Sequence, residues 1–174
     1  MKRLIPAALL GLISGLLRVS FFAALPAPFA VIDPIIFLII WYVADYAPDK
    51  ALAAAIIAGA SIDALSALPF ASNTLAYAAA CAVAILLYNR IFTSHDWPGI
   101  LVMSLAAYSS ILAVLLLLRA ASAVLGGEVF FEMTITEYAP QFFSNLLTHS
   151  LVTIAVLFAF SILRRGHHRN SSIR

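Results

Sequence analysis

The stretch GASIDALSALPFASNTLAY, residues 59–77, contains two apolar segments, a turn between them and one charged side chain, Asp63. The chain around it is 64% hydrophobic and 10% charged, and its mean hydropathy is +1.04. This composition lies far outside the range of soluble domains. The sequence therefore predicts an all-α integral membrane protein, and it raises the question of what neutralises Asp63 inside an apolar helix.

A helix needs about 20 apolar residues to cross a bilayer. Apolar windows separated by proline and charged residues predict six such spans. The 174 residues leave no room for a soluble domain, so the whole chain, residues 1–174, is expected to form one bundle of about six transmembrane helices. The predicted spans are residues 4–25, 32–46, 51–68, 72–92, 98–121 and 141–163, of which the second and third are short.

Most basic residues fall on one side of these predicted spans, although the net charge is only +2. Because cytoplasmic loops are enriched in lysine and arginine, this distribution places both termini in the cytoplasm. It also explains the basic character of the chain without nucleic-acid binding. Arg18 and Arg119 lie elsewhere, and the residues on the predicted cytoplasmic side are Lys2, Arg3, Lys50, Arg90, Arg164, Arg165, Arg169 and Arg174.

Arg18 is the partner that the sequence suggests for Asp63. A charge in the middle of a bilayer costs about 2.5–3.5 kcal/mol on insertion scales, so a partner or a hydrated cavity is needed. Counted from the cytoplasmic ends of their helices, both side chains lie roughly 20 Å deep. Gly11 and Gly15 precede Arg18, and Gly59 lies one turn before Asp63, so small faces of the two helices can pack closely. The sequence thus predicts an Arg18–Asp63 pair. The alternative is that Asp63 caps a short helix near the outer surface while the Arg18 side chain extends to the interface.

The last predicted helix carries a stripe of polar residues at i, i+4 spacing. Lipid would leave their hydrogen-bonding groups unsatisfied, so the stripe is expected to face the interior of the bundle. Three roles are open for it, namely hydrogen bonding between helices, the wall of a small-molecule pocket, and a groove for a partner. This candidate polar groove consists of Gln141, Asn145, His149 and Thr153.

The sequence contains none of the motifs that mark phosphate loops, dinucleotide sites, zinc proteases or serine hydrolases. Cys81, the only cysteine, has no partner for a disulfide or a CxxC metal site and is expected to be a small buried apolar residue. The adjacent His167 and His168 lack further metal ligands. We therefore predict no enzymatic activity, no metal and no cofactor.

Two segments between residues 30 and 80 follow a pattern known from a protein family. The first, DPIIFLIIWYVADYAP at 33–48, is an Asx-Pro start followed by an aliphatic and aromatic helix; the second is residues 59–77, with a GxxxDxxS pattern, a turn and an aromatic-bearing helix. Together they resemble MreD, the small multispanning membrane protein of the bacterial rod-shape system. The positions that match the pattern are Pro34, Gly59, Asp63, Ser66 and Tyr77.

The resemblance implies a non-catalytic scaffold in the inner (cytoplasmic) membrane of a bacterial cell, surrounded by membrane lipids. The partners that it implies are an MreC-like single-span coiled-coil protein and, through it, the MreB filament and the RodA and transpeptidase pair that synthesises peptidoglycan. The loop between the fifth and sixth predicted spans is a candidate surface for these partners. Its acidic and aromatic residues are Glu128, Phe130, Phe131, Glu132 and Glu137.

A second class of protein also fits the length and the expected helix number. The membrane-embedded substrate-binding (S) subunits of energy-coupling-factor transporters for vitamins and other metabolites are similar in size and bind their ligand from the outer side. The polar stripe of the last helix would suit such a pocket. A pocket also needs several convergent polar and aromatic groups, which the sequence alone does not place.

Overall fold

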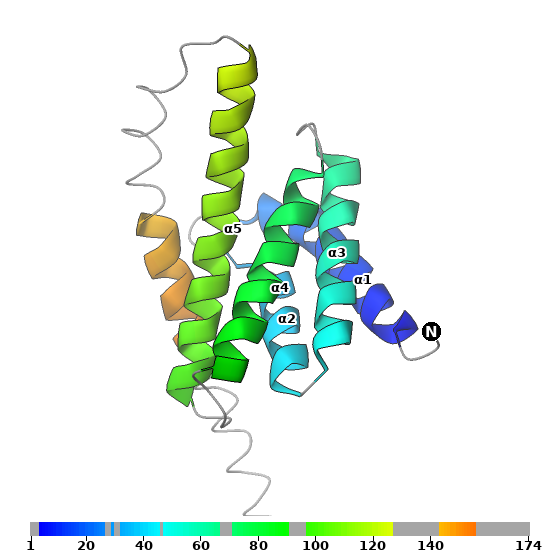
Figure 1. The fold of residues 1–174 in the computed structure, drawn as a ribbon, viewed down its shortest axis with the longest axis vertical. Coiled ribbons are helices and arrows are strands. Elements are labelled where there is room, and N and C mark those ends of the chain that lie inside the picture. The colour runs from blue at the N-terminus through cyan, green and yellow to red at the C-terminus, as the bar shows by residue number, and fades with distance from the viewer. Residues whose placement is uncertain are drawn as a thin grey trace, which may run out of the picture.

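The computed structural model describes residues 4–26, 29, 32–45, 47–66, 71–90, 97–126 and 143–155. These residues form helices and short connections, with no β-strand among them (Figure 1), which confirms the predicted all-α class. The helices are α1 (Ile5–Ser20), the short η1 (Phe22–Ala24), α2 (Pro34–Ala44), α3 (Pro48–Leu65), α4 (Ser72–Arg90) and α5 (Trp97–Gly126). They are followed by one more helical segment, helix 143–155.

Proline marks the start of three of these helices. Pro6 lies in the first turn of α1, and Pro34 and Pro48 are the first residues of α2 and α3. Proline suits this position because the backbone N–H that it lacks would have no partner within the helix, and its fixed φ is already helical. The predicted helix positions therefore agree with the structure to within a few residues for these three elements.

Among the described residues, three helical segments are long and apolar enough to cross a membrane, namely Ile5–Ala24, Ser72–Arg90 and Pro98–Ser122. This length and composition agree with the expected integral membrane protein. By contrast, α2 has 11 residues and is about 16 Å long, roughly half of the 30 Å hydrocarbon core. The predicted span at 32–46 is therefore corrected to a half-length helix. Helix length and composition support three of the six predicted spans.

The short helix α2 lies at the centre of the bundle. It contacts α1, α3, α4 and α5, while α1 packs on α3, α3 on α4, and α4 on α5 (Figure 1). Its residues are apolar almost without interruption, as expected for a helix that is covered on most sides. The buried residues of α2 are Ile35, Ile36, Ile39, Ile40 and Val43.

Small residues allow α3 to approach a neighbour on each of two faces. Gly11 and Gly15 of α1 lie directly against Ala54 and Ala58 of α3, so the predicted close packing of these two helices is confirmed. Gly59 lies on the other face, against the backbone of α4. The Gly59 and Asp63 stripe, which was expected to face α1, therefore faces α4.

Candidate functional site

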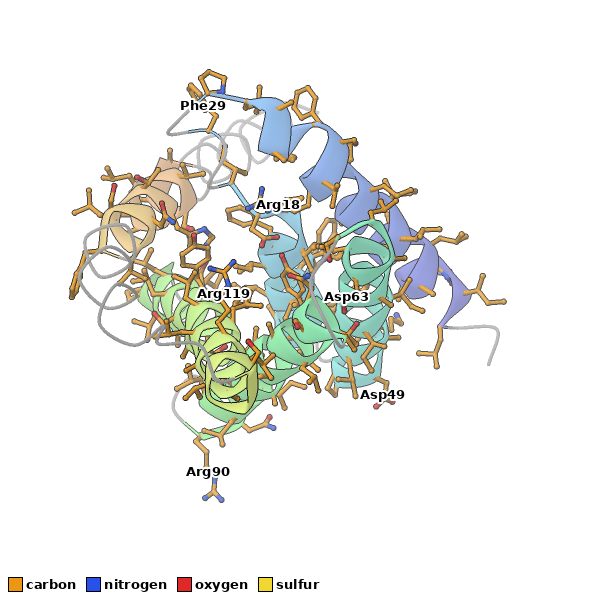
Figure 2. The ribbon with its side chains drawn as sticks, turned by 90° about the horizontal axis from the view of Figure 1, so that it is seen from above. Arg18, Phe29, Asp49, Asp63, Arg90 and Arg119 are labelled. Carbon is orange, nitrogen blue, oxygen red and sulfur yellow. The ribbon has the colours of Figure 1, made fainter. Side chains whose placement is uncertain are left out.

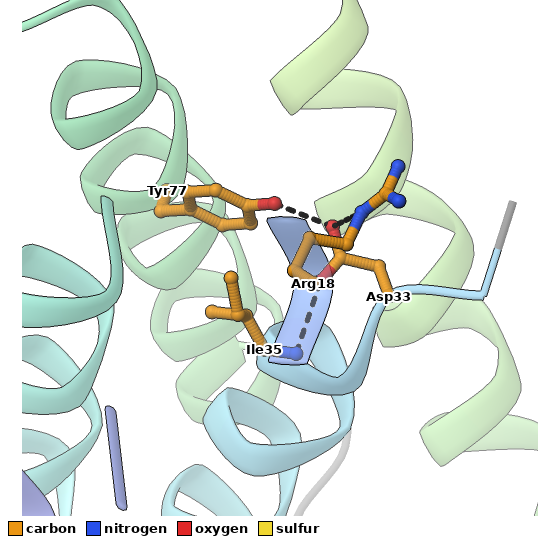
Figure 3. Close-up of polar contacts among 4 residues, drawn as sticks. All are labelled: Arg18, Asp33, Ile35 and Tyr77. Atoms are coloured by element: carbon orange, nitrogen blue, oxygen red, sulfur yellow. Dashed lines mark hydrogen bonds and ion pairs between the residues drawn. The ribbon is translucent and has the colours of Figure 1, made fainter. Parts of the chain in front are cut away.

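Asp33 is the buried acid to which Arg18 is paired. The Arg18 Nε atom lies 3.9 Å from Asp33 Oδ2, and the Tyr77 hydroxyl donates a 2.6 Å hydrogen bond to the same oxygen (Figure 3). The other oxygen, Oδ1, accepts a 3.0 Å hydrogen bond from the backbone N–H of Ile35. The Asp33 side chain is 5% exposed and that of Arg18 is 28% exposed. One carboxylate thus joins α1, the start of α2 and α4.

This arrangement corrects the predicted Arg18–Asp63 pair. The depth count compared Arg18 with Asp63 only and left out Asp33, which lies at the start of the short predicted span 32–46. Because α2 is only half as long as a span, its first turn and Asp33 lie inside the bundle, where Asp33 is 3% exposed. The sequence did contain a signal that Asp33 caps a helix, since an aspartate directly before a proline is a typical start of a helix.

Asp63 instead binds the N-terminus of α4. Its Oδ1 accepts hydrogen bonds from the backbone N–H and the side-chain amide of Asn73, both at 2.9 Å. Its Oδ2 accepts the backbone N–H of Thr74 at 2.9 Å and the Thr74 hydroxyl at 2.7 Å. The first N–H groups of a helix have no partner within it, and a negative charge there is favourable. The structure therefore supports the alternative expectation that Asp63 caps a helix, although the cap comes from a neighbouring helix.

We expect Asp63→Ala to destabilise the protein by about 1–2 kcal/mol, the usual cost of losing a helix cap. The matched control is Asp49→Ala, which removes an exposed acid from the first turn of the same helix and is expected to cost less than about 1 kcal/mol. Both losses are measured as the difference in the free energy of unfolding between each variant and the parent protein, in detergent micelles and followed by circular dichroism. Equal losses for the two variants would contradict the capping role.

The positions that carry the MreD resemblance lie at junctions between helices. Pro34 starts α2, Gly59 contacts the first turn of α4, Asp63 caps α4, and Tyr77 bonds to Asp33. Ser66 follows the last residue of α3, and its buried hydroxyl has no hydrogen-bond partner within the described residues. Three of these five positions, Gly59, Asp63 and Tyr77, therefore have a visible part in holding the start of α2, α3 and α4 together.

Two members of the predicted polar groove meet a serine of α5. The Ser104 hydroxyl lies 3.1 Å from His149 Nε2 and 3.3 Å from the Thr153 hydroxyl. All three side chains are 0–1% exposed. The inward orientation predicted for His149 and Thr153 is confirmed, and interhelical hydrogen bonding is the role that the geometry shows. Ser104 was missed, because a lone serine in an apolar helix has no sequence signal.

The His149 imidazole is held between aromatic side chains. It stacks on Tyr108 of α5, with ring centroids 4.2 Å apart and an interplanar angle of 7°, and the ring of Phe37 of α2 lies 5.9 Å away. Nε2 meets Ser104, whereas the buried Nδ1 atom has no hydrogen-bond partner in the part of the chain that the structure describes. The surroundings of His149 are thus aromatic as well as polar, which the polar stripe in the sequence did not predict.

Other predicted site residues are less involved or lie outside the described part of the chain. Asn145 is half-buried on helix 143–155. Gln141, the acidic and aromatic loop at 128–137 and the histidines at 167–168 lie outside the described residues. Cys81 is fully buried, as expected. Within the described residues there is no group of three or more His, Cys, Asp or Glu side chains that could hold a metal ion.

The described residues define an all-helical fold with helices long and apolar enough to cross a membrane, joined by polar contacts around Asp33, Asp63 and His149. Comparisons with protein-family models, with curated proteins and with solved structures found no match.

Proposed function

We propose that this protein is a non-catalytic membrane scaffold of the bacterial cell-elongation machinery, similar in role to MreD. The observation that carries the proposal is that the positions of the sequence resemblance coincide with helix junctions. Gly59, Asp63 and Tyr77 each contact a second helix or its connecting segment. Residues at such positions keep a bundle rigid, as a platform for other proteins requires, and they are not arranged around a reacting group.

The proposed topology has six passages of the chain through the inner membrane and both termini in the cytoplasm. In Figure 1 the α2–α3 connection and the end of α4 lie at the same end of the bundle. These places carry Lys50 and Arg90, so two of the predicted cytoplasmic basic residues lie at the same end, in keeping with the positive-inside rule for a cytoplasmic face. In this topology α2 occupies only the cytoplasmic half of its passage.

We expect the scaffold to bind another membrane protein through the outer surface of its helices. Photo-crosslinking in living bacteria tests this. A crosslinking amino acid would replace, one at a time, side chains that point away from the bundle on three helices. Suitable positions are Leu86, Leu117 and Leu147, which are 60%, 68% and 64% exposed. We expect at least one of them to capture a single-span coiled-coil protein, with peptidoglycan synthases co-purifying. The matched control places the same residue at Ala84, which is fully buried on α4.

Capture of paired ATPases and a coupling subunit would contradict the scaffold and support the S-subunit class. One observation favours that second class, namely the buried His149 Nδ1 atom, which has no hydrogen-bond partner among the described residues. An S subunit would lose ligand retention in His149→Ala while its expression stayed intact. A scaffold would keep its partner in the same variant.

A further inference from the structure

Helix α3 does not have the composition of a helix that crosses a membrane alone. It has 18 residues, with Asp49 and Lys50 in its first turn and Asp63 near its end. The three segments of the described chain that suit a membrane by length and composition include α4 but not α3. A charged side chain inside a membrane-crossing helix is costly and calls for a partner. The proposed passage of α3 through the membrane therefore needs support from a neighbouring helix.

The first turn of α4 supplies this support. Asp63 accepts four hydrogen bonds of 2.7–2.9 Å from Asn73 and Thr74, two from backbone N–H groups and two from side chains. Gly59 brings the helices so close that an added Cβ would lie 2.5 Å from Thr74 Cα. Seen from above in Figure 2, Asp63 lies where α3 meets α4, whereas Asp49 points away from the bundle. The carboxylate of α3 and the first N–H groups of α4, which have no partner within their own helix, thus satisfy each other.

We propose that α3 and α4 enter the membrane as one helical hairpin, and that the hydrogen bonds of Asp63 to α4 hold α3 across the bilayer. The two helices follow each other in the chain and pack side by side (Figure 1). The other close neighbour of α3 is α1, whose Gly11 and Gly15 pack on its small residues, whereas the Asp63 carboxylate bonds to α4. The inference rests on the proposed topology, in which α3 crosses the membrane, and is independent of the partner that the scaffold binds.

Labelling of the full-length protein in intact bacterial spheroplasts measures whether α3 crosses the membrane. Cys81, the only cysteine, is replaced by alanine. Leu65, which is 59% exposed at the end of α3 that the proposed topology places outside, is replaced by cysteine in this parent protein. A membrane-impermeant maleimide is added outside, and the labelled fraction is compared with that after detergent solubilisation. We expect the parent protein to be labelled from outside.

Asn73→Leu/Thr74→Val is the decisive variant, because it removes both side-chain donors and keeps the two backbone donors. We expect the fraction labelled from outside to fall at least about twofold, since Asp63 loses two of its four hydrogen bonds. Adding Asp63→Leu to this variant is expected to restore the parent fraction, because the charge that needs a partner is then gone. The matched control is Asn89→Leu, the same replacement at an exposed position in the last turn of α4, which should leave the labelling unchanged.

The proposal is overturned if Asn73→Leu/Thr74→Val is labelled like the parent, if Asn89→Leu lowers the labelling equally, or if adding Asp63→Leu fails to restore it. A parent protein that is labelled only after solubilisation would overturn the proposed topology as well. Capture of a different partner in the crosslinking experiment would contradict the scaffold and leave the hairpin standing, so the two failures are distinguishable.

Discussion

Replacing Asp33 by leucine is expected to destabilise the bundle by about 3 kcal/mol. Removing one partner of a buried ion pair typically costs 3–5 kcal/mol, because the remaining charge is left uncompensated. The lower value applies here because the Arg18 side chain is partly exposed. The same change also removes the hydrogen-bond acceptor of Tyr77 and of the Ile35 backbone N–H.

The double variant Arg18→Met/Asp33→Leu separates the charge from the packing. Replacing both partners of a buried pair by apolar residues is often close to neutral, so we expect it to recover at least about half of the stability that Asp33→Leu loses. Reversible unfolding by a denaturing detergent, followed by circular dichroism, gives the free energies. Asp45→Leu, at an exposed acid after α2, is the matched control and should behave like the parent. A double variant whose loss equals the sum of the two single losses would contradict the pairing.

Gly59→Ala is expected to destabilise the protein by about 2–3 kcal/mol, although it adds a single methyl group. A Cβ atom at this position would lie 2.5 Å from Thr74 Cα, 2.8 Å from Thr74 N and 2.9 Å from Asn73 O. All three are backbone atoms of α4, so no side-chain rotation relieves the overlap and the helix itself must move. Overpacking of this kind costs about 1–3 kcal/mol, and the shift would also lengthen the hydrogen bonds of Asp63.

The reactivity of Cys81 reports this movement directly. The thiol lies on α4 and is 0% exposed, so alkylation by a maleimide requires the helices around it to open. We expect Gly59→Ala to be alkylated faster than the parent and to unfold at lower denaturant. Ala60→Leu is the matched control, because Ala60 is the next residue of α3 and is exposed, and its effect should stay within about 0.5 kcal/mol. Unchanged Cys81 protection in Gly59→Ala would contradict the close α3–α4 packing.

The positions of the helices and their buried faces could largely be predicted from the sequence. Apolar windows and prolines located the helices, because each follows from properties of neighbouring residues. The i, i+4 spacing of His149 and Thr153 predicted that both face the interior, and the structure places both there. Glycine spacing likewise predicted the close approach of α1 to α3.

The partners of the polar residues could not be predicted in the same way. The spacing of residues in the sequence predicts which face of a helix a residue occupies, but it does not predict which other helix covers that face. Asp63 lies on a small-residue face as expected, yet the helix against it is α4, and its carboxylate binds Thr74 and Asn73. The depth count failed for a related reason, since two side chains at equal depth on neighbouring helices can still face different partners.

The sequence by itself therefore determined an all-helical, strongly apolar chain, the approximate ends of its helices and the need to neutralise charges inside them. Only the tertiary structure decided that Arg18 pairs with Asp33, that Asp63 caps α4, and that Ser104 meets His149. The physical reason is the difference between local and long-range information. The face of a helix that a residue occupies depends on residues within one or two turns. Arg18–Asp33 and Ser104–His149 instead join segments that become neighbours only when the half-length α2 is enclosed by the longer helices, and the Asp63 cap depends on how α4 packs against α3.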